Sequence, residues 1–142
     1  MALRNLLETN VGAVRLRNKP LLLYGTCIEE RYPEILEDFK KDREPIHICL
    51  ETFHMDHVGY KLANIIKYSK ISELTILTID GSPHCYQLHV LGQDLIRHFT
   101  PELKVEHWVI EKGKLYKIPY QVITVARHLH KVKKLVENSE KD

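Results

Sequence analysis

The sequence has few glycines, few prolines and few cysteines, and it has no long apolar run. Six glycines and six prolines in 142 residues indicate short loops. The three cysteines, at positions 27, 49 and 85, fit neither a disulfide framework nor a CxxC pair. No apolar run approaches the ~18 residues of a membrane span, and residues 1–20 lack the apolar segment of a signal peptide. We therefore expect a cytoplasmic protein whose cysteines are free thiols or metal ligands.

The sequence also has no large excess of positive or negative charge. Twenty-one Lys and Arg residues face nineteen Asp and Glu residues, which is too balanced to indicate a nucleic-acid or membrane partner. No GxGxxG, P-loop, HExxH or GxSxG motif occurs, so the activities that depend on them lose support. The partners we expect are a small molecule or a redox partner protein, and a homodimer is possible.

Apolar strand-like runs alternate with amphipathic helical segments along the chain. The runs fall at residues 21–24, 46–50, 74–79, 105–110 and 115–118, with helical patterns at 28–41, 56–69 and 83–99. The alternation predicts an α/β fold, with residues 1–142 forming one three-layer Rossmann-like or flavodoxin-like domain. We expect a mostly parallel sheet of order 2-1-3-4, with the C-terminal strand antiparallel at the edge.

Two more helices are expected at the ends of the chain. Spaced apolar residues predict a cover helix over residues 5–17. A second apolar stripe predicts a C-terminal helix over residues 120–136, with Pro119 in its first turn and a frayed polar tail after it.

The site is expected beyond the carboxyl ends of the strands, where ligands of open α/β sheets bind. This rule selects residues 25–29, 51–57 and 80–85, which bring thiols and imidazoles to one edge of the sheet. Both groups are ligands for zinc and iron, and we expect a metal site among these residues. The candidate ligands are Cys27, His54, His57 and Cys85, whereas Cys49 lies inside the predicted second strand and is assigned to the core.

The turn at residues 80–85 is the sharpest candidate. Ser82 and Pro83 open a helix with Cys85 in its first turn, where the helix dipole is expected to lower the thiol pKa. Cys85 could then act as a nucleophile with His84 as acid or base, and Gly81, Ser82 and Thr26 could bind an anion or cofactor. A structural alternative stays open, in which Cys85 packs as a small apolar residue and Ser82 only caps the helix.

The segments YGTCIEERYPE, ETFHMDHVGYKLA and LTIDGSPHCYQLH carry a resemblance. In them the chain resembles small prokaryotic proteins labelled ferredoxin-like or iron-sulfur-binding. It is more distantly similar to the delta subunit of methyl-viologen-reducing hydrogenases, in which cysteines follow successive strands. The resemblance implies an iron-sulfur centre at Cys27 and Cys85, with histidines where that subunit would have further cysteines.

Three hypotheses follow for the function. The first is a zinc, iron or iron-sulfur protein in a redox setting. The second is an enzyme that uses the Cys85 thiolate on an anionic small molecule. The third is a non-catalytic domain that binds a small anion or a nucleotide. His89 and His107 have weaker claims to a role in any of them.

Overall fold

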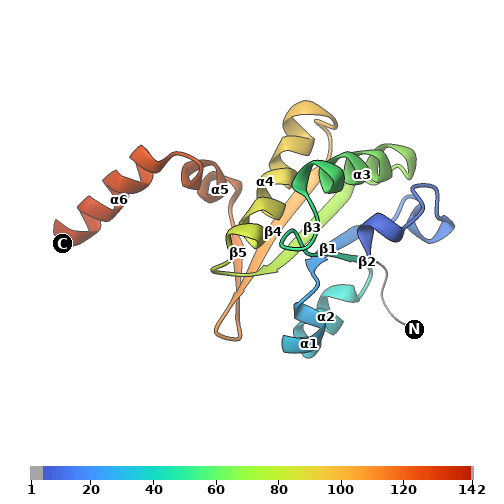
Figure 1. Ribbon diagram of the computed structural model, residues 1–142, viewed down its shortest axis with the longest axis horizontal. Helices are drawn as coiled ribbons and strands as arrows, with labels where there is room; N and C mark the ends of the chain where they lie inside the picture. The colour runs from blue at the N-terminus through green and yellow to red at the C-terminus, as the bar shows by residue number, and fades with distance from the viewer. Residues whose placement is uncertain (1–4, 142) are drawn as a thin grey trace.

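A five-stranded sheet forms the middle layer of the structure, a computed structural model that describes residues 5–141 (Figure 1). The strand order is β2-β1-β3-β4-β5, in which all neighbours are parallel except β4 and β5. The α/β class, the order of the first four strands and the antiparallel edge strand are thus confirmed. The strands are β1 (Leu21–Gly25), β2 (Glu44–Ile48), β3 (Glu73–Ile79), β4 (Lys104–Glu111) and β5 (Lys114–Ile118).

Helices cover both faces of this sheet and so make three layers. α3 (Met55–Tyr68) and α4 (Pro83–His98) pack on one face, and α1 (Ile28–Arg31) with α2 (Pro33–Lys40) lies on the other. α5 (Tyr120–Ala126) and α6 (Leu129–Lys141) follow the last strand. Within residues 5–141 no helix combines the length and the apolar character needed to cross a membrane.

Strand β1 lies between two apolar cores, one on each face of the sheet. Leu21 and Leu23 face the core under α3 and α4, while Leu22 and Tyr24 face the core under α1 and α2. Successive side chains of a strand point to opposite faces, so a strand covered on both sides is apolar throughout. All five residues of β1 are buried, as the continuous apolar run predicted.

Residues 5–17 do not form the predicted cover helix. They contain two 3-10 turns, η1 (Leu6–Glu8) and η2 (Val14–Leu16). Between the turns, Oδ1 of Asn10 accepts a 2.8 Å hydrogen bond from the N–H of Gly12. Such side-chain bonds compete with helical backbone bonds. The segment still covers the sheet, because one buried leucine of each turn packs into the core.

A break at Tyr32 divides the predicted helix at residues 28–41 into α1 and α2. Tyr32 has φ −139° and ψ 58°, outside the helical region, and Pro33 follows it. The proline ring clashes with a helical conformation in the preceding residue. Pro33 itself can start α2, since the first helical residue needs no N–H donor. The single turn of α1 is therefore set apart at the end of β1.

The predicted helix at residues 120–136 is also two helices. The N–H of Arg127 bonds to the carbonyl of Thr124, and α6 starts afresh at Leu129. α5 is fixed on the body because Gln93 of α4 donates a 2.7 Å hydrogen bond to the Tyr120 carbonyl. α6 continues to Lys141, so residues 137–141, predicted as a frayed tail, are helical.

Candidate functional site

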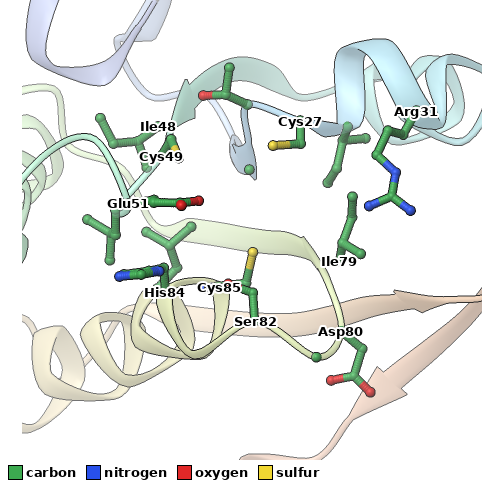
Figure 2. Close-up of a pocket in the computed structure, with 16 residues that line it drawn as sticks. Cys27, Arg31, Ile48, Cys49, Glu51, Ile79, Asp80, Ser82, His84 and Cys85 are labelled. Carbon is green, nitrogen blue, oxygen red and sulfur yellow. Dashed lines mark hydrogen bonds between the residues drawn. The ribbon is translucent and has the colours of Figure 1, made fainter.

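A cavity of about 330 Å³ lies at the carboxyl ends of β1, β2 and β3 (Figure 2). The strand order reverses beside β1, because the chain leaves β1 for β2 on one side and then crosses to β3 on the other. Adjacent crossovers diverge at such a point and leave a crevice. The cavity is lined by Gly25, Thr26, Cys27, Ile28, Arg31, Ile48, Cys49, Leu50, Glu51, Ile79, Asp80, Gly81, Ser82, His84, Cys85 and Leu88.

All three cysteines of the chain line this cavity. Cys27 lies two residues beyond β1, Cys49 one residue beyond β2, and Cys85 in the first turn of α4. The sulfur atoms of Cys27 and Cys85 point into the space between the strand ends (Figure 2). The Cys85 Sγ lies 4.0 Å from the position that a Cβ on Gly25 would take, so the thiol reaches over the end of β1. We call this the cysteine pocket.

The Cys85 thiol does not have the lowered pKa that its place in the helix predicts. Burial raises its pKa, because the charged thiolate is poorly solvated inside the pocket. Hydrogen bonds at Ile79 and Ser82 act in the opposite direction but are smaller, and nearby Cys27 and Cys49 raise the pKa further. The expectation of a helix-activated thiolate was therefore wrong, since desolvation outweighs the helix terminus.

The turn between β3 and α4 has the expected geometry. Gly81 has φ +105°, a conformation that L side chains rarely adopt. Ser82 precedes α4 with extended backbone, and its Oγ accepts a 3.4 Å hydrogen bond from the N–H of Cys85. Pro83 is the first helical residue. Ser82 thus caps the helix as predicted, and Gly81, Ser82 and Thr26 all line the cysteine pocket.

Three charged or polar side chains line the cysteine pocket together with the thiols. Arg31 of α1, Glu51 from the segment after β2 and half-buried His84 of α4 line the pocket. Figure 2 shows the Glu51 carboxylate turned toward the cavity and the Asp80 carboxylate turned away from it. The pocket thus combines soft sulfur ligands with one cation and one anion at its margin.

A hydrogen-bond network holds the end of β1 beside the pocket. The hydroxyl of Thr26 lies 2.9 Å from Nδ1 of His47, and Nε2 of His47 lies 3.7 Å from Oε1 of Glu29. The hydroxyl of buried Tyr24 donates a 2.6 Å hydrogen bond to the same Oε1. Burial and this carboxylate raise the pKa of Tyr24, so the phenol stays protonated.

His54 and His57 are not among the residues that line the cysteine pocket. Their rings are 6.1 Å apart at the start of α3, and both side chains are exposed. α3 turns Val58 and Leu62 toward the sheet, which leaves the preceding histidines at the solvent. The structure brings Cys27 and Cys85 together as predicted, but it does not add these two histidines. In residues 5–141, no three His, Cys, Asp or Glu side chains are grouped so as to hold one metal ion.

Cys49 is the pocket residue that the sequence assigned to the core. β2 begins at Glu44 and ends at Ile48, two residues before the predicted end, and Cys49 is half-buried beyond it. Pro45 suggested a later start, but β2 is an edge strand, where proline is tolerated. The N–H of Glu44 also bonds to the carbonyl of Pro20, which fixes this register.

A buried pair of histidines lies outside the cysteine pocket. His89 on α4 and His107 on β4 are 3% and 2% exposed, and their Nδ1 atoms are 2.9 Å apart. Nε2 of His89 lies 2.8 Å from the hydroxyl of Thr78. Burial, with the neighbouring His107, lowers the pKa of His89 to about 3, and burial lowers that of His107 to about 4. Both rings are therefore neutral near pH 7.

The fold and the site can be compared with known proteins. Neither the curated proteins nor the solved structures contain a match to the chain. A family model for the Rossmann-like domain matches residues 13–142, which include all five strands and the three loops of the cysteine pocket. The chain therefore belongs to the Rossmann-like domain family.

Proposed function

We propose that this protein holds an iron-sulfur cluster in the cysteine pocket and works in electron transfer or redox chemistry. The observation that carries the proposal is that Cys27, Cys49 and Cys85, the only cysteines in the sequence, all line one cavity. Cysteine thiolates are the usual ligands of iron-sulfur clusters.

The size of the cysteine pocket is the reason to propose a cluster and not a single ion. No three ligand side chains of residues 5–141 are grouped around one point. In many iron-sulfur clusters each cysteine binds a different iron atom. The cysteine ligands of a cluster therefore surround a larger volume than the ligands of one zinc ion. A cavity of about 330 Å³ between the thiols provides such a volume.

A fourth ligand can come from two side chains of the same pocket. His84 and Glu51 both line it. Histidine replaces cysteine on one iron of some clusters, and this raises the reduction potential. His84 is therefore the preferred fourth ligand, and Arg31 at the margin would help to balance the negative charge of the thiolates.

The raised pKa of Cys85 predicts how the rate of iron binding depends on pH. A thiol must lose its proton to become a ligand, so binding of iron releases protons. Because burial holds the Cys85 thiol protonated, loading should be slow below neutral pH and faster as the pH rises. A reducing compartment such as the cytoplasm suits three thiols that must stay free of disulfides.

The first test is to analyse the protein after anaerobic purification and reconstitution with iron and sulfide. We expect bound iron and sulfide, visible charge-transfer absorption, and loss of both in Cys85→Ser. His57→Ala is the matched control, since His57 is exposed and does not line the pocket. Metal-free protein with an intact fold after reconstitution would falsify the proposal.

Binding of a small anionic molecule is the second candidate function. Arg31 lines the cavity next to the N-terminus of α4, and both features attract anions. The cavity is also at the lower end of the range for small-molecule sites. Catalysis by a Cys85 thiolate with His84 as acid or base is the less favoured form, because the raised thiol pKa opposes it.

A thermal-shift panel distinguishes this candidate from the cluster. Nucleotides and phosphorylated metabolites at millimolar concentration should raise the unfolding temperature of the metal-free protein, and Arg31→Ala should remove the effect. Arg97→Ala, on the exposed end of α4, is the control. Stabilisation that survives both a chelator and Cys85→Ser supports anion binding, and an unchanged unfolding temperature across the panel argues against it.

A further inference from the structure

Helix α6 has an apolar face that, within residues 5–141, is largely exposed. Leu129, Leu135 and Val136 are 81%, 59% and 51% exposed. α6 packs on α5 and projects away from the sheet (Figure 1). A helix of 13 residues is marginal in water by itself, and most helical stability in proteins comes from packing an amphipathic face. The exposed face therefore suits a partner surface.

Helices α5 and α6 together form what we call the C-terminal arm. An apolar groove of about 310 Å³ runs between the two helices. It is lined by Gln121, Val122, Val125, Ala126, Val132 and Leu135. The arm thus has an apolar groove as well as an exposed apolar face. The groove suits a partner with protruding apolar side chains.

A second apolar groove lies between α3 and α4 on the body of the protein. Its volume is about 790 Å³, and it is lined by Gly59, Ala63, Leu91 and Leu95 among others. Tyr60 and Phe99, which also line it, are 77% and 54% exposed. We call this the α3–α4 groove. The exposed rings of Tyr60 and Phe99 are large and mainly apolar, which suits the apolar groove between α5 and α6.

The arm and the α3–α4 groove match in length and in charge. α6 has 13 residues and α3 has 14, so each is about 20 Å long. The first half of α6 is basic, with three lysines at 131, 133 and 134, and acidic residues follow at 137 and 140. The groove has Asp56 at the start of α3, Lys67 near the end of α3 and Asp94 toward the end of α4. Parallel alignment of α6 with α3 places the lysines of α6 beside Asp56 and its glutamates beside Lys67, while Asp94 is already paired with Arg127 of its own chain at 3.4 Å.

In its own chain, α6 projects away from the α3–α4 groove (Figure 1). Gln93 and Tyr86 of α4 bind the carbonyls of Tyr120 and Ile123 at 2.7 and 3.1 Å, which fixes α5. Only two residues join α5 to α6. We propose that α6 of one copy lies in the α3–α4 groove of a second copy and that the exchange is reciprocal. A reciprocal exchange closes with two-fold symmetry and leaves no open groove.

Light scattering and sedimentation of the full chain test this dimer. We expect the wild type to be dimeric at micromolar concentration. An arm variant, Leu129→Glu with Leu135→Glu, and a groove variant, Tyr60→Glu with Phe99→Glu, should each raise the dissociation constant at least ~100-fold. These side chains are exposed in the single chain, so circular dichroism should show unchanged folds. Val14→Glu, at a 77% exposed apolar residue elsewhere, should leave the dimer intact.

Mixing the two variants gives a result specific to this arrangement. The intact arm of the groove variant can enter the intact groove of the arm variant, so the mixture should recover a weaker heterodimer. A wild type that is monomeric, including one that binds anionic vesicles instead, would overturn the proposal. So would a dimer that persists in the arm variant, or one that the arm variant loses and the groove variant keeps.

Discussion

Replacing Cys49 by serine should abolish cluster assembly while leaving the fold of the metal-free protein intact. Cys49 is half-buried beyond the end of β2 and lines the same cavity as Cys27 and Cys85. A serine hydroxyl has nearly the same size but is a poor ligand for iron, which prefers thiolate in such clusters. We expect bound iron and sulfide to fall at least ~10-fold after reconstitution.

The same variant separates the ligand role of Cys49 from the core role that the sequence indicated. If Cys49 only filled space, serine would leave the iron content unchanged and lower the free energy of unfolding by ~1–2 kcal/mol, the cost of an imperfectly bonded hydroxyl. Thr52→Ala, an exposed change in the same segment, is the control. Iron content and denaturant unfolding should be measured on the same preparations.

Acid should destabilise this protein strongly, beginning near pH 6.5. His89 and His107 are neutral in the fold because their pKa values are lowered to about 3 and about 4. In the unfolded chain each imidazole takes up a proton below its ordinary pKa of ~6.5. The unfolded state then binds more protons than the native state, so stability is lost as the pH falls from ~6.5 toward these lower values.

The expected slope is large enough to measure. Each histidine contributes up to ~1.4 kcal/mol per pH unit, and the full effect of His107 is ~3 kcal/mol. Denaturant unfolding at pH 7, 6, 5 and 4.5 should show the decline. His89→Leu with His107→Leu should flatten it, whereas His54→Gln with His57→Gln, at exposed positions, should not. An equal slope in both double variants would show that other groups cause the acid sensitivity.

The fold could be predicted from local sequence patterns to a large extent. Apolar runs separated by amphipathic segments lead to strands and helices because each element has a fixed side-chain period. The right-handed crossover and the short connections then leave few strand orders, and the observed order is among them. Prediction was weakest where one residue interrupts a periodic pattern, as Pro33 does between α1 and α2.

The candidate site could be predicted only in part. The turn at Gly81, Ser82 and Pro83 has a local signature, and Cys85 follows it at a fixed helical position. The edge of the sheet where Cys27 and Cys85 meet follows from parallel pairing of β1 and β3. The exclusion of His54 and His57 does not follow from spacing, because it depends on how α3 is oriented on the sheet.

The residues alone were enough to predict that Cys27 and Cys85 each follow a strand and that Ser82 caps the helix carrying Cys85, because apolar runs and helix caps are local signals. That Cys49 lies in the same pocket could be learned only from the folded chain, because the pairing of β2 with β1 sets where β2 ends. The tertiary structure also paired His89 with His107 and reversed the expected direction of the Cys85 pKa shift. The pairing of the histidines and the pKa of Cys85 both depend on burial, and burial depends on segments that are far apart in the chain.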